Sequence, residues 1–142
     1  MTFLDAAAVI AYLRAEPAGT EVRGLLRAGG CALAAPNAAE VVDKLIRRFE
    51  WPASRARDTI GALLAELTPV PADAAIAVRA GELCARHYRP RTAELSLADC
   101  LLLASAGSGD KIATSDAPLL RAGRAEGVEV VPLPDSSDNR PE

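Results

Sequence analysis

Short apolar segments alternate with longer helical patterns along almost the whole chain, and this alternation restricts the fold more than any other feature. Strands that alternate with helices are typical of a parallel sheet with crossover helices. We therefore predict an α/β fold, with a short and mainly parallel β-sheet flanked by helices on both faces. Strands are predicted at residues 2–4, 31–35, 111–114 and 128–131, with a weaker strand or turn at 68–70. Helices are predicted at residues 6–15, 20–27, 53–67, 72–86 and 96–106, and two more begin after Asn37 and at Ala117.

The length of 142 residues fits one domain with a sizeable core. No internal repeat or long linker divides the chain, so we predict one domain over residues 1–133. Residues 134–142 are polar and contain proline, which predicts a disordered tail. The first residues lack the basic region of a signal peptide, and no apolar run is long enough to span a bilayer. We therefore expect a soluble cytoplasmic protein without membrane contact.

The cysteines and the charge balance exclude some classes of protein. Cys31, Cys84 and Cys100 are far apart, lie in apolar stretches and form no CxxC pair. We therefore expect buried, reduced thiols rather than a disulfide or a zinc site. A net charge of −3 argues against nonspecific coating of nucleic acid. The arginines of residues 86–91 fit either contacts to RNA phosphates or a solvated loop.

Acidic residues stand near the ends of the predicted strands. Asp5 directly follows the first strand, and Glu40 lies in the first helical turn after the second. Asp116 follows residues 111–114 after one serine, while Asp99 lies in the first turn of the preceding helix. Ligands of parallel α/β sheets collect outside the carboxyl ends of the strands. These four acids are therefore candidates for one site.

Each acid also has a structural explanation at a helix N-terminus. Asp5 and Asp116 stand directly before predicted helices, and Asn37 with Glu40 has the spacing of a capping box. Acids in a first helical turn also complement the helix dipole. Taken singly, each acid is better explained as a cap than as a catalytic group.

Asp99 and Glu40 differ in their surroundings. Asp99 has capping-box spacing from Ser96, but its helix is apolar on nearly every side, and a lone buried carboxylate needs a proton, a partner or a cation. Glu40 lies opposite the apolar stripe of its helix, so it faces either solvent or a polar cleft. An ion pair with Lys44, one turn further on, is a third explanation for Glu40.

Several carboxylates in one crevice repel each other and stay ionised together only beside positive charge. No histidine or thiolate accompanies these acids in a metal-binding spacing, so a hard divalent cation such as Mg²⁺ is the natural partner. Beside a phosphodiester, such an ion stabilises negative charge and activates water. The acids therefore lead to the hypothesis of metal-dependent hydrolysis of a phosphate ester.

Four segments, FLDAAAVIAYL, PNAAEVV, LSLADCLLLASA and IATSDAPLL, occur in the order and spacing of the PIN domain. Over about residues 1–133 the chain resembles this family, in particular the VapC-type toxins of type II toxin–antitoxin systems. The resemblance implies an α/β/α sandwich and an endoribonuclease that uses Mg²⁺ or Mn²⁺ to cut single-stranded or looped RNA. It implies Asp5, Glu40, Asp99 and Asp116 as the catalytic acids.

The resemblance also implies roles for individual residues and partners. Asp5, Asp99 and Asp116 would be metal ligands, while Glu40 would hold a metal-bound water or orient the attacking one. Asn37 and Ser115 would be hydrogen-bond donors behind the ligands. A cognate antitoxin peptide would occupy a groove near the active site, in a homodimer or a toxin–antitoxin hetero-oligomer.

Two features depart from the family pattern, and two other functions stay open. Alanines at residues 6–8 follow Asp5 where many members carry a hydroxyl or Asn, and Asn37 stands where Ser or Thr is common. The first alternative is a non-catalytic PIN-like module that binds RNA or protein. The second is a receiver-type signalling domain, which needs an acidic pair after its first strand and a lysine after a later one. Only Asp5 follows the first strand here, and Lys111 precedes its strand, so the receiver alternative is weak.

Overall fold

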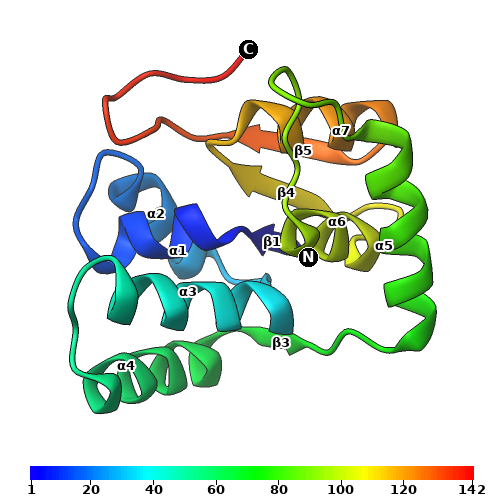
Figure 1. Ribbon diagram of the computed structural model, residues 1–142. Helices are drawn as coiled ribbons and strands as arrows, with labels where there is room; N and C mark the ends of the chain where they lie inside the picture. The colour runs from blue at the N-terminus through cyan, green and yellow to red at the C-terminus, as the bar shows by residue number, and fades with distance from the viewer.

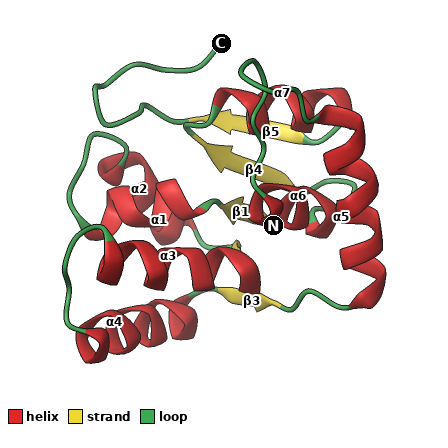
Figure 2. Cartoon of the chain, in the orientation of Figure 1, coloured by secondary structure: helices red, strands yellow, loops and turns green.

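A computed structural model describes residues 1–142 and shows one five-stranded sheet covered by seven helices (Figures 1 and 2). All neighbouring strands pair in parallel, in the order β3-β2-β1-β4-β5. The predicted α/β class is therefore confirmed. The strands are β1 (Thr2–Leu4), β2 (Cys31–Ala34), β3 (Thr68–Val70), β4 (Lys111–Thr114) and β5 (Glu129–Pro132). The helices are α1 (Ala6–Leu13), α2 (Gly19–Ala28), α3 (Ala35–Arg47), α4 (Ala53–Glu66), α5 (Ala74–His87), α6 (Leu97–Ser105) and α7 (Ala117–Ala125).

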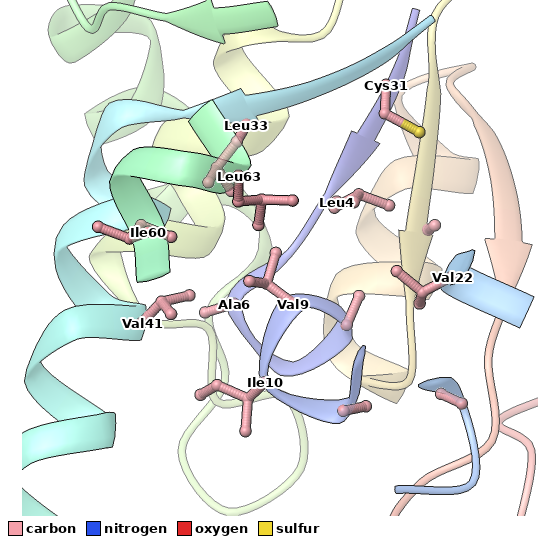
Figure 3. Close-up of a cluster of buried hydrophobic side chains, with 14 of the residues drawn as sticks. Leu4, Ala6, Val9, Ile10, Val22, Cys31, Leu33, Val41, Ile60 and Leu63 are labelled. Carbon is pink, nitrogen blue, oxygen red and sulfur yellow. The ribbon is translucent and has the colours of Figure 1, made fainter. Parts of the chain in front are cut away.

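Two buried clusters fill the two faces of the sheet. Side chains alternate along a strand, so Phe3 joins one cluster and Leu4 the other. The cluster around Leu4 is covered by α1 to α4 and is shown in Figure 3. The cluster around Phe3 is covered by α5, α6 and α7, which lie on the right of Figure 1. Both faces are therefore apolar, as a parallel sheet between two helical layers requires.

Helix α3 begins earlier than the sequence suggested. Its N-cap is Ala34, directly at the end of β2, and Pro36 lies in its first turn. Proline suits that turn because it lacks the N–H that would stay unpaired there. Asn37 is consequently inside the helix and fully buried, so the predicted capping box of Asn37 with Glu40 is wrong.

The cysteines correct a second expectation. Cys84 on α5 and Cys100 on α6 form a disulfide, with their Cα atoms 5.7 Å apart, while Cys31 is a buried free thiol. The expectation of three reduced thiols is therefore wrong. Helices α5 and α6 pack against each other in the Phe3 cluster, and only this packing brings together two cysteines 16 residues apart in sequence.

The disulfide predicts a redox-dependent stability. Because it closes a loop over a separation of 16 residues, its reduction should lower the free energy of unfolding by about 3 kcal/mol. Urea unfolding with and without dithiothreitol measures this difference. Cys31→Ser should keep the response to reductant, and Cys84→Ser should abolish it. Equal unfolding midpoints for the oxidised and reduced wild-type protein would contradict the prediction.

The C-terminal segment 134–142 contains neither helix nor strand. Asp135 Oδ1 accepts backbone hydrogen bonds from Ser137 at 2.8 Å and Asn139 at 2.9 Å. The Arg140 guanidinium donates to Glu21 on α2 and, at 2.8 Å, to the Pro132 carbonyl oxygen. These contacts bring the end of the chain close to α2. The predicted disorder of residues 134–142 stays a prediction. None of the helices is both long and apolar enough to cross a membrane.

Candidate active site

The four predicted acids line one cavity of about 230 Å³. Asp5 follows β1, Glu40 lies on α3, Asp99 on α6, and Asp116 stands between β4 and α7. Carboxylates from four separate parts of the chain therefore converge where β1 and β4 end. The sequence pattern had suggested this convergence, and the parallel topology produces it, because the carboxyl ends of parallel strands lie at one edge.

Asp5 is the most buried of the four, with 3% of its surface exposed. It is the N-cap of α1: its Oδ1 accepts from the Ala8 N–H at 2.7 Å, and its Oδ2 accepts from the Thr114 hydroxyl at 2.5 Å. Burial raises the pKa of Asp5 to about 7; these two hydrogen bonds oppose the rise, and Asp99 and Asp116 add to it. Asp5 is thus held in one orientation at the floor of the cavity.

Asp99 and Ser96 form the predicted capping box at the start of α6. The Asp99 N–H donates to Ser96 Oγ at 3.0 Å, and the Ser96 N–H donates to Asp99 Oδ2 at 2.8 Å. Burial raises the pKa of Asp99, and the negative charges of Asp116 and Glu40 raise it further. The cap therefore holds a carboxylate in a place that disfavours its charge.

Asp116 is the N-cap of α7, where its Oδ2 accepts from the Leu119 N–H at 2.8 Å. Burial is the main cause that raises its pKa, while the positive charges of Arg121 and Lys44 lower it. Asp5, Asp99 and Asp116 all combine a capping role with a place in the cavity, so the capping role is confirmed and their catalytic role stays a prediction.

Glu40 differs from the other three acids because it caps nothing. Its Oε1 lies 3.0 Å from Lys44 Nζ, which confirms the predicted ion pair, and it also faces the polar cavity. Lys44 is the only cationic side chain that lines this cavity. One ammonium group therefore faces an excess of carboxylates.

Two residues of the cavity region were missed by sequence reasoning. The buried Thr114 hydroxyl donates to Asp5 and accepts from the Asp116 N–H at 2.9 Å, so it joins two of the acids. A hydroxyl at the end of the strand at residues 111–114, directly after two apolar residues and two residues before Asp116, was the available signal. Glu94 also lines the cavity, from the loop before α6. No local pattern marked Glu94, because its place depends on the path of that loop.

The two predicted hydrogen-bond donors lie elsewhere. Asn37 is fully buried, and neither atom of its side-chain amide has a hydrogen-bond partner. Ser115 lines a neighbouring cavity instead of the acidic one. Neither side chain donates to the four acids in this structure, and their supporting role stays a prediction.

The donor set of the acidic cavity suits a hard divalent cation. Its carboxylates supply only oxygen ligands, which Mg²⁺ prefers. Burial raises the pKa of Asp5 and of Asp99, and neighbouring negative charges raise both further. As the side chains stand, however, no three Asp, Glu, His or Cys residues are close enough to hold one ion. Binding would require these side chains to rotate toward each other.

The fold and the cavity define an α/β domain with a carboxylate site at the carboxyl edge of its sheet. The chain matches the family model of the PIN domain over residues 2–125, and it belongs to this family. No curated protein sequence matches it.

Solved structures share the fold. DNA-bound VapBC from Salmonella typhimurium is 16% identical with a TM-score of 0.66, covering 92% of this chain and 96% of that chain. FitAcB from Neisseria gonorrhoeae is 19% identical with a TM-score of 0.65 and the same coverage. Mycobacterium tuberculosis VapC20, described as a sarcin-ricin loop cleaving toxin, is 17% identical with a TM-score of 0.59, covering 90% of this chain and 85% of that chain. At these identities the likeness shows the fold alone.

Proposed function

We propose that this PIN domain is a metal-dependent endoribonuclease and the toxin of a toxin–antitoxin pair in the cytoplasm. The observation that carries the proposal is the meeting of Asp5, Glu40, Asp99 and Asp116 around one cavity with a single lysine. Structural neighbours that are toxin–antitoxin complexes, and one described as a sarcin-ricin loop cleaving toxin, support it. A cognate antitoxin, and a homodimer or toxin–antitoxin hetero-oligomer, belong to the same proposal.

Asp5, Asp99 and Asp116 are the proposed ligands of Mg²⁺ or Mn²⁺. When bound, such an ion supplies positive charge at the phosphate and lowers the pKa of water. Asp5 is held for this role by Ala8 and Thr114, and Asp99 by its capping box. Asp99 and Asp116 use only Oδ2 as a cap and keep Oδ1 for an ion, whereas both oxygens of Asp5 already accept a hydrogen bond.

Glu40 and Lys44 act at the cavity wall in this proposal. Glu40 uses neither carboxylate oxygen as a cap, so its free oxygen can orient the attacking water. Lys44 neutralises part of the charge of the carboxylates and so reduces their repulsion of a phosphate. At the same edge of the cavity, Lys44 therefore favours binding of the phosphate, while Glu40 orients the water.

Removal of divalent ions tests the proposal. Protein treated with EDTA should lose its cleavage of a structured RNA, and added Mg²⁺ or Mn²⁺ should restore it, because the carboxylates alone cannot offset the charge of the reacting phosphate. Gel analysis of end-labelled RNA measures the cleavage. Cleavage that ignores chelation would contradict the metal-dependent mechanism.

The same assay separates the proposal from a second candidate. No three acids are preassembled around one point, which favours a PIN-like module that binds RNA or protein without cutting. Inactivity with every divalent ion, together with retained RNA binding, would support that module. Asp99→Asn protein, purified in parallel, controls for contaminating nucleases, because a contaminant would cleave equally in both preparations. Asp73→Asn controls for the loss of a helix-capping charge, since Asp73 caps α5 outside the cavity.

A further inference from the structure

A second cavity of about 370 Å³ adjoins the acidic one, and the two share Ala7 and Lys44 in their walls. Helix α1 and the residues around the C-terminal end of α3 form two sides of it, and residues 134–136 of the C-terminal segment close another side. A ligand that occupied both cavities would therefore pass directly from one to the other beside Lys44.

We propose that this second cavity holds the nucleotide next to the scissile phosphodiester of single-stranded RNA. The inference rests on the proposed function, because it names what lies beside the phosphate in the acidic cavity. The volume falls in the range of small-molecule sites, which is about 300–1,000 Å³.

A stacked pair of side chains suits a nucleobase. The Arg14 guanidinium carbon lies 3.6 Å from the centroid of the Phe49 ring, and both residues line the cavity. Single-stranded bases stack on aromatic rings and on guanidinium planes. Ile10 and Ala11 add an apolar wall against which a flat base can pack.

The charges in this cavity suit the backbone of the same nucleotide. Arg48 lines it and has no carboxylate within ion-pair distance, while Arg14 has only a 3.6 Å contact with Glu16. Arg48 also lies 5.3 Å from the Phe49 centroid, on the same stack. An unpaired guanidinium is a good partner for a phosphate. Asp135 lines the same cavity, but its Oδ1 accepts from the Ser137 and Asn139 N–H groups, and it forms no ion pair with Arg48.

The polar groups at the rim offer contacts to base edges. The hydroxyls of Ser115 and Ser136 and the carboxylate of Glu16 line the cavity. Hydroxyl and carboxylate oxygens can accept hydrogen bonds from the exocyclic amino groups of bases. The cavity is therefore suited to select the base beside the cut as well as to hold it.

Binding of a labelled RNA in EDTA tests this subsite apart from cleavage. The probe is a fluorescein-labelled, single-stranded 12-nucleotide RNA of mixed sequence, followed by fluorescence anisotropy. Arg14→Gln and Arg48→Gln should each raise the Kd by about 5- to 10-fold, the effect of losing one base stack or one phosphate contact. Ser136→Trp should raise the Kd similarly, because a large side chain at the rim obstructs the cavity without changing any charge. Arg79→Gln, on the exposed face of α5, is the matched control and should bind as wild type does.

Three results would overturn the subsite: wild-type protein that does not bind the probe, cavity variants that bind as tightly as wild type, or an equal loss in Arg79→Gln. The cavity would then belong to another occupant, such as a protein segment. Circular dichroism of each variant identifies a loss of fold. Because the binding assay contains EDTA, it measures RNA binding without cleavage, so either proposal can be supported while the other fails. Failure of this inference is thus distinguishable from failure of the proposed nuclease function.

Discussion

Asp99→Asn is expected to lower the rate of RNA cleavage by about 10²- to 10³-fold, the cost of removing one group that stabilises charge in a transition state. The substitution removes the carboxylate charge from the cavity. It keeps the shape of the side chain and an oxygen that can accept from the Ser96 N–H, so the capping box is retained. Initial rates of cleavage at saturating Mg²⁺ measure the effect.

The controls for Asp99→Asn separate chemistry from helix capping. Asp73 caps α5 through a 2.8 Å hydrogen bond from the Ile76 N–H, outside the acidic cavity. Asp73→Asn therefore makes the same chemical change at another helix and should keep the wild-type rate. A wild-type rate in Asp99→Asn would show that this carboxylate is not part of the chemistry.

Asp5→Asn is expected to make the protein more stable at pH 8 and to flatten the dependence of its stability on pH. The pKa of Asp5 is about 7 in the folded protein, against 3.8 for a free side chain. Above about pH 4 the unfolded chain releases this proton, but the folded protein keeps it until about pH 7. The stability that the protonated Asp5 side chain contributes is therefore fully present below about pH 4 and is lost as pH rises through about 7.

The size of this effect follows from the shift in the Asp5 pKa. A rise of the Asp5 pKa from 3.8 to about 7 corresponds to about 4 kcal/mol of unfolding free energy at most, because a change of one in pKa is about 1.4 kcal/mol. Urea unfolding in EDTA between pH 4 and pH 8 measures it without competition from bound metal. Asn keeps an oxygen for the Ala8 N–H, but its amide nitrogen cannot accept the hydrogen bond that Oδ2 receives from the Thr114 hydroxyl, which reduces the gain. Parallel pH profiles for wild type and Asp5→Asn would refute the predicted coupling.

Under the proposed mechanism, the burial that raises the pKa of Asp5 also affects how strongly metal binding stabilises the protein. Asp5, Asp99 and Asp116 are each less stable as anions than free carboxylates, so the burial of their charges costs folding stability. A divalent cation would reverse that cost, and the protein would gain stability when it binds. The same groups that weaken the fold are thus the ones suited to bind the ion.

The local pattern of the sequence was enough to predict most elements of the fold. Lys111–Thr114 forms the strand expected at residues 111–114, and the weak segment at residues 68–70 is the edge strand β3. Hydrophobic periodicity and the break signals between elements depend on neighbours along the chain, so they can be read without knowing the packing. The acids at strand ends followed from the same reasoning, since parallel strands end at one edge of a sheet.

Only the tertiary structure decided which side chains meet. The Cys84–Cys100 disulfide, the bridge from Thr114 to Asp5 and the place of Glu94 at the cavity depend on how separate elements pack. Asn37 lost its predicted capping role because α3 begins directly at the end of β2. The sequence by itself determined the order of strands and helices and the acids at their junctions, because these follow from short-range periodicity. Burial, charge coupling and the second cavity were decided in three dimensions, where residues distant in sequence share one desolvated volume.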